Sequence, residues 1–202
     1  MPYVTSEPVR RWLGPRREAI DNVAAGHAKV GDLTGPGRPL DASKPLAHAY
    51  VLVIVSQFQG FVRDMHDLAV ERLLSASGAT ANFVPILTEG IVNARNIDRG
   101  NPTHSNVTSD FARIGLSPFN MATRNARWAT PGDSEQFNRL MGLRNALAHG
   151  NDDGLRSLLL RGGVQDTVSW ARGQLPVLNR YARVLDHMVW DHLKATTGRA
   201  PW

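Results

Sequence analysis

Residues 45–77 carry the longest continuous pattern in the chain. From Ala49 to Val55 no residue is charged, and from Phe58 onwards apolar residues recur at the spacing of an α-helix. The apolar run could form a strand by itself. Its continuity with the periodic part predicts one long helix instead, buried at the centre of the core, with Pro45 in its first turn.

Shorter helical patterns lie on both sides of this segment. We expect helices over residues 14–30, 80–94, 105–116, 133–149 and 165–195, and loops or irregular structure over residues 31–45, 98–104 and 118–131. Pro176 should kink or split the last helix. Asp133 and Gln136 have the spacing of a capping box, and Gly150 suits the position after a helix end. The expected fold class is all-α, a helical bundle with long antiparallel helices.

The length of 202 residues suits one domain. We expect a single domain over residues 1–202, in which residues 1–42 form an N-terminal helix and loop and residues 43–195 form the bundle core. Cysteine is absent, which excludes disulfides, thiol chemistry and cysteine-based metal sites. No secretory signal is apparent, and the apolar run is far shorter than the ~18 residues of a membrane span. The expected location is the cytoplasm, with no membrane partner.

The net charge is +5, and 20 of the 23 basic residues are arginine. A guanidinium presents a planar fork that suits phosphate and stacks on bases. This excess of positive charge favours a polyanionic partner such as nucleic acid, although solvated surface arginines would give the same number of basic residues. One basic cluster lies where cations oppose the dipole of an expected helix and could contact phosphate, namely Arg10, Arg11, Arg16 and Arg17.

The expected helix over residues 133–149 carries the candidate catalytic residues. At about 100° per residue, with Phe137 at zero, its core face is formed by Leu140, Met141, Leu147 and Ala148. Arg144 falls at about −20°, within that face, where a guanidinium is costly unless it is paired or lines a cleft. Asn145 and His149 fall at about +80° and +120°, on a polar edge beside it.

These residue types suit phosphoryl transfer to a hydroxyl. Arg144 can hold a phosphate and stabilise the charge that develops on it, and His149 can move protons near neutral pH. Asn145 can orient either group or bind the RNA. One histidine cannot easily act as base and acid at once, so we expect a homodimer that brings two copies of the pair to one cleft. The 2′-hydroxyl of RNA would attack the adjacent phosphate there, with no metal and no cofactor.

The spacing alone is not specific. With this composition an Arg-x4-His match is expected about 0.7 times by chance. Arg99 and His104 also match, across a glycine and a proline that exclude a single helix. His187 and Asp191, four residues apart, could bind a metal, but a third ligand at a suitable spacing is missing.

A purely structural interpretation of the pair also stays open. His149 would then bind the carbonyls at the end of its helix. Arg144 would form a buried ion pair with Asp64 or Asp67.

Residues 144–150, Arg-Asn-Ala-Leu-Ala-His-Gly, resemble the signature of the HEPN superfamily of small helical bundles. The order of elements over residues 43–195 is also similar. Many members are metal-independent endoribonucleases that work as dimers in toxin–antitoxin and phage-defence systems. The resemblance implies that Arg144 and His149 are the catalytic pair and that Asn145 is an accessory polar residue. It implies RNA as the substrate and an antitoxin or defence-complex component as a further partner.

Two positions depart from branches of that superfamily. One toxin branch has a modified tyrosine where this chain has Asn151. Several branches have an acid midway along the early helix that touches the motif arginine. Here that region reads Gln57-Phe58-Gln59, and Asp64 is the candidate for the supporting role. If Asp64 does not take this role, the alternative function is that of a non-catalytic module. Such a module would bind RNA or a nucleotide, or would be a scaffold in a defence complex. A helical DNA-binding regulator is a third alternative, but no basic recognition helix stands out.

Overall fold

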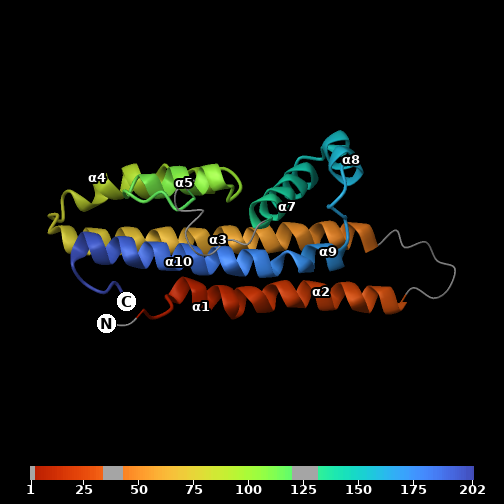
Figure 1. The fold of residues 1–202 in the computed structure, drawn as a ribbon, viewed down its shortest axis with the longest axis horizontal. Coiled ribbons are helices and arrows are strands. Elements are labelled where there is room, and N and C mark those ends of the chain that lie inside the picture. The colour runs from red at the N-terminus through yellow and green to blue at the C-terminus, as the bar shows by residue number, and fades with distance from the viewer. Residues whose placement is uncertain (1–2, 34–42, 120–131) are drawn as a thin grey trace. The chain divides into compact units, whose positions relative to one another are not determined.

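The computed structural model describes residues 3–33, 43–119 and 132–202. Within these residues the chain is helical and contains no strand, which confirms the all-α prediction (Figure 1). The elements in chain order are α1 (Glu7–Leu13), α2 (Pro15–Leu33), α3 (Ser43–Ser77), α4 (Val84–Thr88), the π-helical turn η2 (Glu89–Asn93), the 3-10 turn η3 (Asn96–Asp98), α5 (His104–Ala112), α7 (Asp133–Ala148), α8 (Asp152–Leu160), α9 (Val168–Gly173) and α10 (Leu175–Thr197).

The long early helix is confirmed, because α3 covers all of residues 45–77. The last expected helix is split into α9 and α10 at Gln174, and Pro176 lies in the first turn of α10. A proline is tolerated there because the first amides of a helix have no intrahelical acceptor.

Other boundaries differ from the expectation. The N-terminal helix starts earlier and is divided at Gly14 into α1 and α2. Residues 80–94 form α4 and η2 instead of one helix, and Ile114 lies beyond the end of α5. The middle of the expected loop over residues 31–45, and most of residues 118–131, lie outside the described residues.

The chain divides into two compact units. The first unit comprises Met1–Arg10, Gln59–Ala129 and Arg180–Trp202, and the second comprises Arg11–Phe58 and Thr130–Asn179. The helices α1, α3 and α10 each contribute residues to both units.

In the first unit, the second half of α3 and most of α10 run in the same direction, and not antiparallel as expected (Figure 1). Its core contains Phe61, Met65, Val107, Phe111, Leu185 and Val189, all almost fully buried. Apolar side chains that recur every three or four residues on each helix supply this core.

A buried polar network ties α3, the turn before α5 and α5 together in this unit. The Asp110 carboxylate accepts hydrogen bonds from the backbone N–H of Asn96 at 2.8 Å and of Ile97 at 2.9 Å. The backbone carbonyl of Asp110 lies 3.2 Å from Nε2 of His66. Asp110 and His66 are both fully buried. This network joins η3 to α5 and α5 to the long helix.

Protonation of His66 is opposed in the folded protein. Burial lowers the pKa of His66 below its usual value of 6.5, and the positive charge of Arg95 lowers it further. The unfolded chain therefore binds a proton first as the pH falls, and stability is lost as the pH drops below about 6.5. We expect the free energy of unfolding to fall by up to about 1.4 kcal/mol per pH unit until the lowered pKa is reached. Urea denaturation between pH 7.5 and 5 measures this effect, and a His66→Gln variant should lose less stability over the same range. Parallel losses in both proteins would contradict the prediction.

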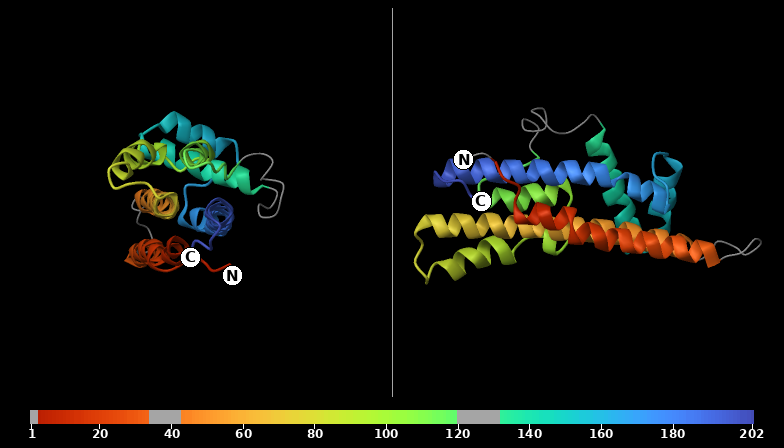
Figure 2. Two further views of the ribbon diagram at one scale, coloured as in Figure 1. Left: turned by 90° about the vertical axis from the view of Figure 1, so that its left-hand side faces the viewer. Right: turned by 90° about the horizontal axis from the view of Figure 1, so that it is seen from below.

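In the second unit, α2 and the first half of α3 lie side by side in opposite directions (Figures 1 and 2). The ring of Phe58 contacts Trp12 and Phe137 edge-on, with centroid distances of 5.5 and 5.9 Å. The Trp12 Nε1–H donates to Oδ1 of Asn179 at 2.9 Å. These aromatic contacts join α1, α3, α7 and α10 in one core.

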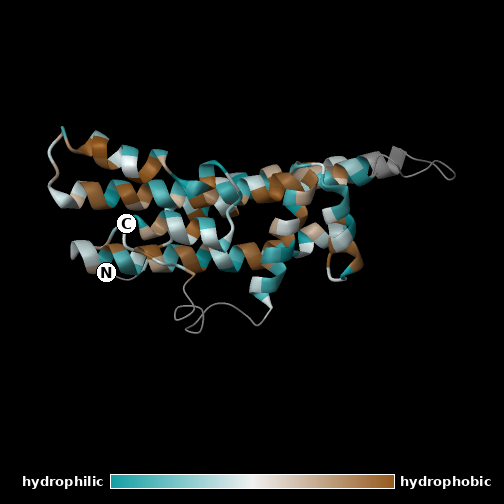
Figure 3. Cartoon of the chain, turned by 90° about the horizontal axis from the view of Figure 1, so that it is seen from above, coloured by the Kyte–Doolittle hydropathy of each residue, from teal (hydrophilic) through white to brown (hydrophobic). Residues whose placement is uncertain are grey.

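Two further apolar features concern α3 and α4. In α3, residues Lys44–Ser77 are long and apolar enough to cross a membrane by length and composition, and 44% of the most apolar stretch is buried in the protein. Core helices of soluble proteins share that property. Around α4, which Figure 3 colours as apolar, the side chains of Phe83 and Ile86 are 60% and 66% exposed.

Candidate active site

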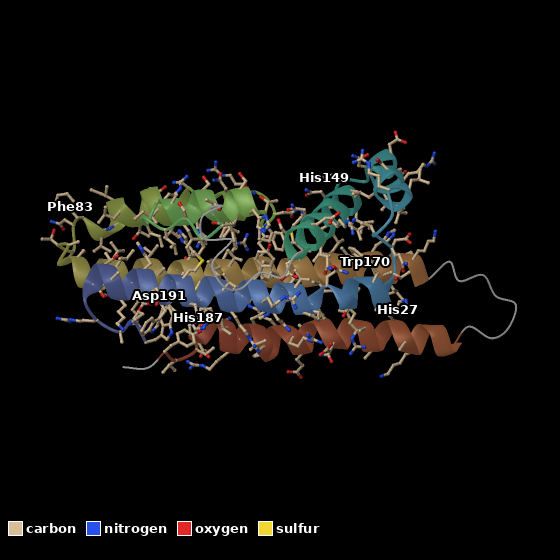
Figure 4. All side chains as sticks on the ribbon, viewed as in Figure 1. His27, Phe83, His149, Trp170, His187 and Asp191 are labelled. Carbon is tan, nitrogen blue, oxygen red and sulfur yellow. The ribbon has the colours of Figure 1, made fainter. Side chains whose placement is uncertain are left out.

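His149 lies at the corner between α7 and α8 (Figure 4). It is the C-cap of α7, and Gly150 follows with a φ of +59°. The N–H of Asn151 donates to the carbonyl of Ala146 at 2.9 Å, as in a Schellman motif. The predicted role of Gly150 is therefore confirmed, because a left-handed residue is needed at this position.

The next helix begins immediately after this motif. The Asn151 side chain accepts a hydrogen bond from the N–H of Gly154 at 2.8 Å and so caps α8. Asp152 and Asp153 occupy the first turn, where acidic residues are favoured by the helix dipole. The helix α8 was not among the expected helices, although its Asn-Asp-Asp start is a typical signal for a helix N-terminus. Two consecutive caps fix the backbone that carries His149.

The start of α7 differs from the expected capping box. The N-cap is Gly132, with a φ of +94° and no side-chain hydrogen bond. Asp133 is instead the first residue of the helix, and it is buried. Gln136 is exposed.

The buried face of α7 is also rotated relative to the expectation. Its buried apolar residues are Phe137, Leu140, Met141, Leu143 and Ala146, so the face is centred near Leu140. This centre lies about 60° from Phe137. Ala148, which we expected on the core face, is exposed. Arg144 falls about 40° from this centre, between Phe137 and Leu140, so it lies within the buried face but not at its middle.

Arg144 is half-buried. Among the described residues of its own unit, its guanidinium makes no hydrogen bond or ion pair. Asp67, one of the two expected partners, accepts a hydrogen bond from Arg95 at 2.5 Å within the first unit. A half-buried guanidinium without a carboxylate loses part of its hydration and gains little in return.

The imidazole of His149 and the side chain of Asn145 are exposed, on the polar edge where the sequence placed them. Within the described part of its unit, the ring of His149 forms no hydrogen bond. The ring therefore does not satisfy the carbonyls of the helix end, which was the structural interpretation of this residue. Asn145 lies between Arg144 and His149 around the helix, and the three span an arc of about 140°.

The supporting acid, Asp64, is half-buried on α3 and belongs to the first unit, whereas Arg144 belongs to the second. The two glutamines midway along α3 have other partners. Oε1 of Gln57 accepts from Arg16 at 3.1 Å, and Nε2 of Gln59 donates to the carbonyl of Gly100 at 2.9 Å. They are engaged in structural contacts.

Most of the N-terminal arginines are bound within the protein. Arg10 pairs with Glu7 at 2.9 Å, and Arg17 pairs with Asp21 at 3.0 Å. With Arg16 held by a glutamine, this cluster offers little free charge to a phosphate.

Two further sequence candidates have structural roles. Arg99 follows η3 and His104 begins α5, so this second Arg-x4-His match is not one helix, as predicted. The ring of His187 stacks on that of Tyr3 at 3.7 Å (Figure 4), and Asp191 is exposed. In the described ranges, no three His, Asp or Glu side chains gather in a group that could hold a metal ion.

Comparison with known proteins gives no assignment, since no family model, no curated protein and no solved structure matches this chain.

Proposed function

We propose that this protein is a metal-independent endoribonuclease of a toxin or phage-defence type, with a HEPN-like bundle and a composite site in a homodimer. The observation that carries the proposal is the half-buried guanidinium of Arg144, which has no hydrogen bond or ion pair among the described residues of its unit, on the helix that ends at His149. An arrangement that is unfavourable for folding is typical of a site that awaits an anionic ligand. The exposed Asn145 and His149 beside it supply the polar groups that a phosphodiester needs.

The chemistry follows from these groups. His149 of one protomer accepts the proton of the ribose 2′-hydroxyl, and the 2′-oxygen forms a bond to the adjacent phosphorus. The bond from phosphorus to the 5′-oxygen breaks, and His149 of the partner protonates that oxygen. Arg144 binds the non-bridging oxygens and stabilises the charge of the transition state. The products are a 2′,3′-cyclic phosphate and a 5′-hydroxyl, so the reaction needs no metal and no external nucleophile.

The proposed reaction needs a dimer because it needs two histidines. A histidine that acts as base must be neutral, and one that acts as acid must be protonated, so one ring cannot hold both states at once. A two-fold axis would supply two copies. The cytoplasm, RNA as substrate, and an antitoxin or defence-complex partner complete the proposal.

The test is cleavage of single-stranded RNA by the purified protein in the presence of EDTA. We expect cyclic phosphate ends, and no cleavage of the same RNA with 2′-O-methyl groups. Arg144→Ala should slow cleavage by about 10²–10³-fold, as for loss of one donor to a developing anion. Arg156→Ala is the matched control, because Arg156 is exposed on α8 and has no hydrogen bond or ion pair among the described residues of its unit.

The outcome that would overturn the proposal is RNA binding without cleavage by the wild-type protein. That result would select the non-catalytic RNA-binding module. A preference for duplex DNA over single-stranded RNA would instead select a DNA-binding regulator.

A further inference from the structure

A cavity of about 730 Å³ lies within the second unit, between the start of α7 and the end of α8. Its lining includes Ser134 and Asn138 from α7, and Arg139, Arg161, Glu135 and Gly162. The size falls within the range of sites that hold small molecules or parts of larger ligands. None of these residues was a candidate in the sequence analysis.

The two arginines of this cavity differ in their partners. Arg139 pairs with Glu135 at 2.7 Å and lies so close to Gly163 that a Cβ there would clash with the guanidinium. Arg161, the C-cap of α8, is exposed and makes no hydrogen bond or ion pair with the described residues of its unit. The charges of the lining therefore leave one unbalanced cation, which is Arg161.

The remaining lining groups favour the same kind of ligand. Ser134 and the exposed Asn138 supply hydrogen-bonding side chains. The cavity also opens at the N-terminal turn of α7, where the helix dipole favours negative charge. The N-cap there is a glycine, so no side-chain oxygen competes for the first amides.

The cavity is continuous with the polar edge of α7. Asn138 and Asn145 are both exposed and are seven residues apart, which places them two helical turns, about 10 Å, from one another on one side. Asn145 in turn adjoins His149. A strand that lies along this edge would therefore pass from the cleaved phosphate to the cavity.

We propose that this cavity binds a backbone phosphate of the same single-stranded RNA, a few nucleotides from the cleaved bond, with Arg161 as its cation. The path of the strand from His149 to the cavity rests on the proposed function. Binding of a phosphate in the cavity does not require cleavage. Arg139, which is paired with Glu135 and lies close to Gly163, is the pre-positioned second donor.

The experiment measures binding of a fluorescent single-stranded RNA with 2′-O-methyl groups to the wild-type protein across a range of salt concentrations. Each phosphate contact contributes about 0.7 to the slope of log affinity against log salt for a single strand. We expect Arg161→Ala to lower that slope by about 0.7 and to weaken binding several-fold at low salt. Arg156→Ala removes the same charge from the same helix but lies outside the cavity lining, and it should leave the slope unchanged.

Equal slopes for the two variants would overturn the inference, whether or not the protein cleaves RNA. A lower slope for Arg161→Ala in a protein that cuts no RNA would support the cavity and overturn the catalytic proposal. A second measurement tests binding of a free ribonucleoside monophosphate. If it binds as tightly as the RNA strand and Arg161→Ala abolishes this binding, the cavity is a nucleotide pocket and its role in holding a strand is wrong.

Discussion

His149→Ala is expected to lower the rate of RNA cleavage by about 10²–10⁴-fold, which is the usual contribution of a positioned acid or base. The fold should tolerate the change. The hydrogen bond that closes the last turn of α7 comes from the backbone N–H of this residue, and Gly150 keeps its left-handed conformation. Because the imidazole is exposed and has no bond within the described part of its unit, its loss removes no packing contact of consequence.

The measurement is a single-turnover cleavage assay across pH. His27→Ala is the control, since it removes another imidazole, on α2 and outside the proposed site (Figure 4 labels both histidines). A composite site adds a second expectation for the same variant. Excess His149→Ala protein should inhibit the wild type, because mixed dimers keep only one of the two histidines. Wild-type rates in the His149→Ala variant would show that the histidine has no part in the chemistry.

The features that the sequence predicted best depend on local physics. The continuous pattern of residues 45–77 specified α3 because helical periodicity and an apolar run agreed over many turns. Gly150 marked the end of α7 because a left-handed residue after a helix favours glycine. The exposed edge with Asn145 and His149 followed from the helical repeat alone.

The features that could not be predicted from the sequence depend on long-range packing. The buried face of α7 is centred near Leu140 because Leu143 and Ala146 are also buried, and periodicity counted from Phe137 could not show which apolar residues the neighbours would cover. The expected cap at Asp133 failed for a similar reason, since its carboxylate is buried.

The cavity could not be predicted because it depends on α8. Nine residues are few for a helical pattern, and this helix is recognisable only from its cap. Arg139 and Arg161 are 22 positions apart in the sequence and share a cavity because α7 and α8 fold back on each other. The close packing is visible at Gly142, where an added Cβ would lie 3.6 Å from Leu158.

The largest loss of stability is expected for Asp110→Ala in the first unit. The carboxylate is fully buried and accepts two backbone hydrogen bonds, from Asn96 and Ile97. Hydrogen bonds to a charged group contribute about 1.5–3 kcal/mol each, and the two amides would be left without their acceptor in a buried place. We therefore expect Asp110→Ala to reduce the free energy of unfolding by about 4 kcal/mol, measured by urea denaturation near pH 7.5.

Two further variants separate this effect from general sensitivity of the region. Asp110→Asn keeps one acceptor oxygen of the same shape and should cost about half as much. Ser109→Ala removes a neighbouring hydroxyl that accepts from Nδ2 of Asn96 at 3.0 Å, but this hydrogen bond is exposed, so the loss should stay below about 1 kcal/mol. If Asp110→Ala is no more harmful than Ser109→Ala, the carboxylate does not hold this segment. If the predicted order is observed, the position of η3 on α5 depends on one buried carboxylate. The same residue also contacts His66, because the backbone carbonyl of Asp110 is the hydrogen-bond partner of that ring.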